Sequence, residues 1–262
     1  VFPNTNIRGG LCYFLWDKSH DNEVSLTKVI THQLNSEPII SIRSLKTDNE
    51  NTFIRHGLAI KILDKVKSSN NFESFEEYIS SRKPFGIDGY FTKNEKFRAS
   101  KIGLNNPIIC YGKGKQIGYL ERDEITKKTE WIDNYKVFTP RANNIGTELN
   151  DDNLNAFIGE KGTICTESYI VVGADLKLDA ISSKHLCNYF STRFVRFMHS
   201  LAKASQDATS KTYKFVPLQN FTSKSDIDWS KSISEIDKQL YGKYGLKKEE
   251  IGFIESMIKP ME

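Results

Sequence analysis

The sequence predicts an α/β or α+β fold, and three patterns along the chain lead to this prediction. Residues 87–172 contain short apolar runs separated by Gly, Asn and Pro, which is typical of short strands joined by turns. Residues 53–67 and 182–206 instead carry apolar side chains at helical spacing. Residues 233–259 show the same spacing on both sides of Gly245, which predicts a helical hairpin. We therefore expect a mixed sheet with peripheral helices.

Residues 1–44 are predicted to form strands. The polar stretch Ser44 to Asn51 follows them, so we place a domain boundary there and expect a second domain over residues 45–262. Three runs within the first domain have the aromatic or alternating character of strands: Leu11 to Trp16, which we expect to be buried, Val24 to His32, and Pro38 to Ile42.

The second domain begins with a predicted helix over Phe53 to Lys67, because apolar residues recur there every four positions. A short acidic helix over Phe72 to Ser81 follows, and Pro84 disfavours helix beyond it. Four later runs fit strands best: Ile108 to Tyr111, Ile117 to Leu120, Lys136 to Thr139 and Thr163 to Val172.

The longest predicted helix covers Ser182 to Gln206, where aromatic and aliphatic residues form a wide apolar stripe. Tyr213 to Val216 is predicted to be a strand that Pro217 closes. The helical hairpin of the tail consists of Ile233 to Tyr244 and Lys247 to Lys259.

The composition indicates a folded cytoplasmic protein with no membrane partner. Hydrophobic residues make up 38% of the 262 residues, and the mean hydropathy is −0.48. The most apolar stretch, Gly10 to Trp16, is far shorter than the roughly 20 residues that cross a bilayer. Because the chain opens at Val1 without a leader, we expect it to be a piece of a longer polypeptide.

The cysteines indicate the redox state of the compartment, and the net charge indicates which kinds of partner are compatible with the chain. The four cysteines form no CxxC pair, so we expect buried free thiols in a reducing compartment: Cys12, Cys110, Cys165 and Cys187. The formal net charge is +4 and the pI is about 8.7, which is compatible with a nucleic-acid partner without requiring one.

Several catalytic and metal-binding motifs are missing from the sequence. It has no Walker loop, no HExxH and no Cys/His metal cluster. Gly112, Gly114 and Gly118 miss the GxGxxG spacing by one residue and fit a hairpin turn better. Asp175 and Lys177 have the Asp-x-Lys spacing of some nucleases, although a solvated loop explains them better. We therefore predict no catalytic residue and no metal site in this chain.

A series of motifs in a fixed order extends along nearly the whole chain. It begins with Val1-Phe2-Pro3 and the run from Ile7 to Lys18, and continues with Ser80 to Gly86 and Asn188 to Phe197. Lys203 with Gln206, Phe215-Val216-Pro217 and Leu240 to Leu246 complete the series. The series resembles the C-terminal part of adenine-N6 DNA methyltransferases from type II restriction–modification systems, including the type IIG enzymes in which a nuclease is fused to the methyltransferase.

The resemblance implies that residues 1–44 are the last strands of a methyltransferase sheet and that residues 45–262 are a DNA target-recognition domain. The catalytic Asn-Pro-Pro-Tyr and the Gly-rich S-adenosylmethionine motif of the family are absent here and lie upstream in the family. We therefore expect the parent enzyme to bind S-adenosylmethionine, this chain to hold no cofactor, and methyl transfer to be absent from this chain alone. The implied partners are double-stranded DNA and the rest of the parent chain.

A methyltransferase of this kind must turn its adenine out of the duplex and must read a specific site. Phe2 matches the family's aromatic residue that stacks on the flipped base. Arg and Asn or Gln side chains pair with guanine and adenine edges, and Lys binds phosphates. On these grounds, helped by the family motifs, the predicted DNA contacts are Arg82, Lys83, Arg141, Asn143, Asn144, Lys161, Lys203, Gln206 and Lys211.

Two alternatives remain open at this point. The chain could itself be a nuclease, for which Asp175 and Lys177 are the only candidates. It could instead be a specificity module that docks on separate catalytic chains through exposed apolar helix faces, and Ile233 to Met261 is then the best candidate surface.

Overall fold

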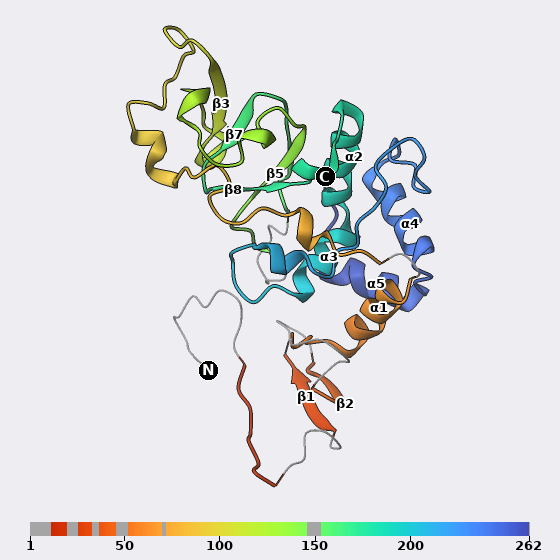
Figure 1. The fold of residues 1–262 in the computed structure, drawn as a ribbon. Coiled ribbons are helices and arrows are strands. Elements are labelled where there is room, and N and C mark those ends of the chain that lie inside the picture. The colour runs from red at the N-terminus through yellow and green to blue at the C-terminus, as the bar shows by residue number, and fades with distance from the viewer. Residues whose placement is uncertain are drawn as a thin grey trace.

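The computed structural model describes residues 12–19, 26–32, 37–45, 52–69, 72–145 and 153–261. Over these residues the mixed α/β class is confirmed, with three small sheets and five α-helices (Figure 1). The predicted stacking residue Phe2 lies outside the described residues.

The strands pair mainly antiparallel. β1 (Thr27–Thr31) pairs with β2 (Ile39–Arg43) in a two-stranded hairpin. β3 (Pro107–Tyr111) lies between antiparallel β4 (Ile117–Glu121) and parallel β7 (Thr163–Cys165). β5 (Lys136–Pro140) lies between β6 (Phe157–Gly159) and β8 (Tyr169–Val172), antiparallel to both. The predicted strand over Thr163 to Val172 is therefore two strands that belong to different sheets.

The β6–β5–β8 sheet has an apolar core on each of its faces. Val137 and Val172 belong to a core formed with the helices, whereas Phe138 and Val171 belong to a second core shared with β3, β4 and β7. Successive side chains of a strand point to opposite faces, so neighbouring residues enter different cores. The sheet thus separates a helical layer from the β4–β3–β7 layer.

The helices surround the first core and confirm several predictions. The predicted tail hairpin is present, with Gly245 at a φ of +59° and the N–H of Leu246 donating to the carbonyl of Tyr241 at 2.9 Å. The five helices are α1 (Gly57–Lys67), α2 (Ala180–Ser191), α3 (Arg193–Leu201), α4 (Ile233–Lys243) and α5 (Lys248–Met257).

The prediction of one long helix over Ser182 to Gln206 is wrong, because α2 and α3 are separated at Thr192. Thr192 has an extended backbone with ψ 150°, and its hydroxyl caps α3 by accepting from the N–H of Val195. The carboxylate of Asp237 in α4 accepts from the N–H groups of Arg193 and Phe194 at 3.0 and 2.9 Å. These contacts satisfy the free N–H groups of the new helix start.

The prediction of a buried strand over Leu11 to Trp16 is also wrong for the described residues. Cys12 to Asp17 has no regular structure, and Tyr13, Phe14, Leu15 and Trp16 are 70–95% exposed. None of the strands in the described ranges pairs with this segment in a sheet. The other two strands predicted within residues 1–44 are confirmed as β1 and β2, although Ile30, Ile39, Ile40 and Ile42 on this hairpin are exposed.

Two further elements are shorter than predicted. α1 begins at Gly57 rather than Phe53 because Thr31 and Arg43 of the hairpin donate to the carbonyls of Arg55 and Ile54. The acidic helix predicted for residues 72–81 is a single 3-10 turn, Phe75–Tyr78.

The prediction of a strand over Tyr213 to Val216 is wrong, because a 3-10 turn, Ser210–Tyr213, precedes irregular backbone there. Phe215 and Val216 are fully buried in the helical core. A short apolar run indicates burial but does not distinguish a strand from other buried structure.

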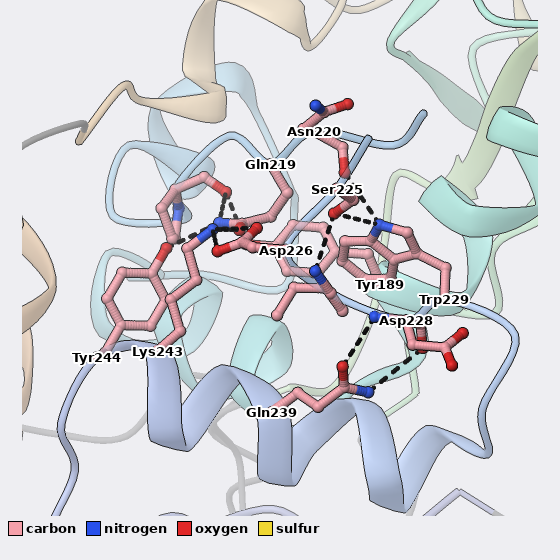
Figure 2. A network of polar contacts seen from close by, with 12 residues as sticks. Tyr189, Gln219, Asn220, Ser225, Asp226, Asp228, Trp229, Gln239, Lys243 and Tyr244 are labelled. Carbon is pink, nitrogen blue, oxygen red and sulfur yellow. Dashed lines mark hydrogen bonds and ion pairs between the residues drawn. The ribbon is translucent and has the colours of Figure 1, made fainter. Parts of the chain in front are cut away.

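A network of polar contacts attaches the irregular segment 217–232 to α4 (Figure 2). Lys243 donates to the Gln219 side chain at 2.8 Å and lies 2.9 Å from a carboxylate oxygen of Asp226. Gln219 donates to the hydroxyl of Tyr244 at 2.7 Å, and the indole of Trp229 donates to the carbonyl of Asn220 at 2.9 Å. These contacts hold the segment without regular secondary structure.

None of the helices in the described part of the chain combines the length and the apolar character that crossing a lipid bilayer requires.

The buried carboxyl group of Asp237, which caps α3, should make the stability of the fold depend on pH. Burial raises the pKa of Asp237 to about 6, against the opposing effects of the two backbone N–H groups and of Arg196 and Arg193. The folded state therefore binds the proton more tightly than the unfolded chain does. The free energy of unfolding should fall as the pH rises from about 4 to about 6, by up to about 3 kcal/mol from this group.

Urea unfolding of the wild type and of Asp237→Asn at several pH values between about 4 and 7 measures this contribution. The neutral amide cannot titrate, so the variant should lack this part of the pH dependence. Identical pH dependence in both proteins would contradict the assignment.

Candidate nucleic-acid interface

Two of the predicted DNA-binding segments meet where the chain leaves β5. The N–H of Arg141 donates to the carbonyl of Ser168 at 2.9 Å, and the carbonyl of Arg141 accepts from the N–H of Ala208 at 2.6 Å. The N–H of Asn143 donates to the carbonyl of Gln206 at 3.1 Å. The loop 141–145 is therefore bonded along its length to the segment that follows α3.

The third predicted segment reaches the same place through Glu167. Both Nε and Nη2 of Arg82 lie 2.7 Å from one carboxylate oxygen of Glu167, the residue before Ser168. The ammonium of Lys83 lies 4.0 Å from the same oxygen. We call the predicted residues that converge here the β5-end cluster: Arg82, Lys83, Arg141, Asn143, Asn144, Lys203 and Gln206.

Each arginine of the β5-end cluster has a carboxylate partner. Arg141 forms an ion pair with Asp207 through Nη1, and Arg82 forms the pair with Glu167. The hydrogen bond from Arg82 keeps the pKa of Glu167 below its usual value, so the pair is ionised at neutral pH. The sequence prediction missed both carboxylates. Asp207 follows Gln206 directly, but nothing in the sequence connects Glu167 with Arg82.

Two members of the cluster hold the loop rather than face outward. The ammonium of Lys203 donates to the carbonyls of Asn143 and Ile145, and Lys203 is only 9% exposed. Burial lowers the pKa of Lys203 to about 8, while Asp207 acts in the opposite direction. Asn143 is buried as well, and its side-chain oxygen accepts from the N–H of Ile145 at 3.3 Å. In this structure both side chains position the loop 141–145.

The side chains that solvent reaches are therefore a subset of the predicted contacts. The side chains of Arg82 and Lys83 are 62% and 41% exposed, and that of Arg141 is 25% exposed. Lys211 is exposed on the 3-10 turn that follows Ala208.

Lys161 lies apart from the cluster, at the opposite end of β5. Its ammonium is 5.8 Å from the ring centroid of Tyr135, on the turn between β6 and β7. The fully buried Lys136, the first residue of β5, attaches this turn by donating to the carbonyls of Trp131, Asn134 and Glu160 at 2.9–3.2 Å. The structure thus does not bring Lys161 together with the other predicted contacts.

Asp175 and the apolar faces of the tail, on which the two alternative functions rest, have structural partners within the chain. Asp175 accepts a hydrogen bond from the indole of Trp131 at 2.7 Å. Over the described ranges, His, Cys, Asp and Glu side chains form no group of three or more that could hold a metal ion. In the tail, Ile236, Leu240 and Ile254 are buried in the helical core, so the apolar faces of α4 and α5 are covered by this chain itself.

No protein-family model matches the sequence, and a search of curated proteins finds no match either.

The role of Lys203 in holding the loop predicts a loss of stability in Lys203→Met. Methionine fills a similar volume but leaves two carbonyl oxygens without their donor, which should destabilise the fold by about 1–3 kcal/mol. Chemical unfolding checks the value. Lys211→Met removes an exposed cation nearby and should change stability by less than about 0.5 kcal/mol. Equal stability of the two variants would refute the positioning role.

Proposed function

We propose that this chain recognises a specific sequence in double-stranded DNA, as the target-recognition part of a bacterial adenine-N6 DNA methyltransferase of a restriction–modification system. The observation that supports the proposal best is the convergence of three distant segments, around Arg82, Arg141 and Lys203, in the β5-end cluster. DNA contacts were predicted in each of these segments from residue types and motifs, before their positions in the fold were known. A site that must contact several adjacent bases needs such convergence.

The partly exposed members of the cluster have the chemistry of base and phosphate contacts. A guanidinium presents a planar pair of donors to the O6 and N7 atoms of guanine, which suits Arg82 and Arg141. The amides of Asn144 and Gln206 can bond bidentately with adenine. Lys83, and Lys211 on the 3-10 turn next to the cluster, supply cations for phosphates. Asn143 and Lys203 then act as positioning residues.

The carboxylate partners give the two arginines a defined starting geometry. Glu167 occupies the Nε and Nη2 donors of Arg82, so DNA must compete with this carboxylate for them. A lone phosphate competes less well than a base edge combined with neighbouring contacts. This competition should weaken nonspecific binding more than specific binding, and it therefore raises discrimination.

The methyltransferase part of the proposal rests on the sequence resemblance and on the first domain. The exposed Ile30, Ile40 and Ile42 lie on one face of the β1–β2 hairpin and form an apolar surface that suits a neighbouring catalytic domain. The parent enzyme would supply S-adenosylmethionine binding and methyl transfer, would flip the target adenine toward Phe2, and would act in the cytoplasm.

Selection from a library of randomised duplexes tests the proposal directly. We expect enrichment of one short sequence. Arg82→Ala and Arg141→Ala should each lower the affinity for the selected duplex by roughly 5- to 150-fold, corresponding to about 1–3 kcal/mol, and relax the preference at one position. Lys248→Ala removes an exposed cation at the start of α5, outside the cluster, and should leave the affinity unchanged. No enrichment, or tight binding by both arginine variants, would refute the proposal.

A further inference from the structure

Residues 89–103 form an exposed basic arm beside β3. None of the DNA contacts predicted from the sequence lies in this arm. The arm begins with a 3-10 turn, Gly89–Lys93, and continues as an irregular loop, visible in yellow next to β3 in Figure 1. It contains four Lys or Arg residues and one Glu, and all five are exposed. The four cations are Lys93, Lys96, Arg98 and Lys101.

The backbone of the arm is fixed to the β3–β4 hairpin, so its cations project from an ordered base. The Phe97 ring packs against Gly118, where no larger residue would fit because a Cβ atom there would lie 2.3 Å from the ring. Arg98 and Tyr119 exchange two backbone hydrogen bonds, at 3.0 and 2.8 Å. Thr92 packs against Gly112 in the same close manner.

The arm lies within residues 82–128, the part of the chain that accounts for its positive net charge. Residues 82–128 contain 11 Lys and Arg and 5 Asp and Glu, a net charge of +6, whereas the whole chain has a net charge of +4. The remainder of the chain is therefore slightly acidic. Lys96 forms an ion pair with Glu124 at 3.2 Å, but Lys93, Arg98 and Lys101 have no carboxylate within ion-pair distance in the described part of the chain.

The arm is continuous with the β5-end cluster through Glu167. One oxygen of this carboxylate binds Arg82, and the other accepts from the N–H of Gly89, the first residue of the arm, at 3.1 Å. Lys127 also packs its aliphatic stem against Gly86, between Arg82 and the arm. The start of the arm is thus held beside Arg82, and the exposed Lys127 lies next to the segment that joins the two.

We propose that the basic arm binds the phosphate backbone of the duplex beside the bases that the β5-end cluster reads. The proposal rests on the proposed function and adds a second contact to it. The arginines of the cluster are paired with carboxylates, whereas three cations of the arm are available to phosphates without breaking an ion pair. The arm should therefore supply sequence-independent affinity, and the cluster should supply discrimination.

The test measures binding of the full chain to a random-sequence duplex by fluorescence anisotropy over a salt series. The arm variant is Lys93→Gln/Arg98→Gln/Lys101→Gln. The control variant, Lys184→Gln/Lys238→Gln/Lys248→Gln, removes three exposed cations from the helical side, so its charge change is the same. A third variant, Lys93→Arg/Arg98→Lys/Lys101→Arg, keeps the charge of the arm. Circular dichroism confirms that each variant is folded.

Loss of three phosphate contacts should make the slope of log Kobs against log salt shallower by roughly 2–3. We expect this change in the arm variant only, with wild-type slopes in the control and in the charge-conserving variant. Wild-type binding with an unchanged slope in the arm variant, or equal losses in arm and control variants, would overturn the role of the arm and leave the proposed function intact. Absence of binding by the wild type would overturn both.

Discussion

The burial of β5 and β8 on both faces is the constraint that places the candidate interface. Their side chains enter the helical core on one side and the core of the β4–β3–β7 layer on the other. A shift of one residue in register would exchange the two sets of side chains, so the packing permits a single register. Arg141 follows β5 directly, and Ser168 precedes β8 directly, so their hydrogen bond is fixed by the strands. Arg82 reaches the same point because Glu167 is the neighbour of Ser168.

At each end of β5, a buried lysine donates hydrogen bonds to backbone carbonyls of the adjacent irregular segments. Lys136 binds the carbonyls of the turns at the start of the strand, and Lys203 binds those of the loop 141–145 at its end. Burial lowers the pKa of Lys136 to about 7 and that of Lys203 to about 8. A lysine in a basic chain is therefore not necessarily a surface cation. Exposed cations lie elsewhere, among them Lys93, Arg98 and Lys101 of the arm and Arg82 of the β5-end cluster.

Elements that depend on local sequence patterns were predicted correctly. Features that depend on contacts between residues distant in the sequence were not predicted. The tail hairpin, α1 and the strands β3, β4 and β5 follow from periodicity, Gly and Pro. The break at Thr192 depends on Asp237, which caps α3 from a different helix. In the candidate site, Arg82, Arg141 and Lys203 were proposed from their residue types, and Arg82 and Lys203 also from the motifs that resemble the family. Their carboxylate partners and the burial of Lys203 depend on contacts 58 to 85 residues apart in sequence, which no local pattern indicates.

Hydrogen–deuterium exchange with and without an excess of duplex DNA locates the contact surface on the chain, and therefore shows whether DNA binds at the β5-end cluster. We expect slower exchange in peptides that cover residues 80–103, 141–145 and 203–211, and unchanged exchange in α4 and α5. DNA binding accompanied by protection of α4 and α5 alone, with no change in the three other segments, would contradict the assignment of the β5-end cluster as the DNA-reading surface.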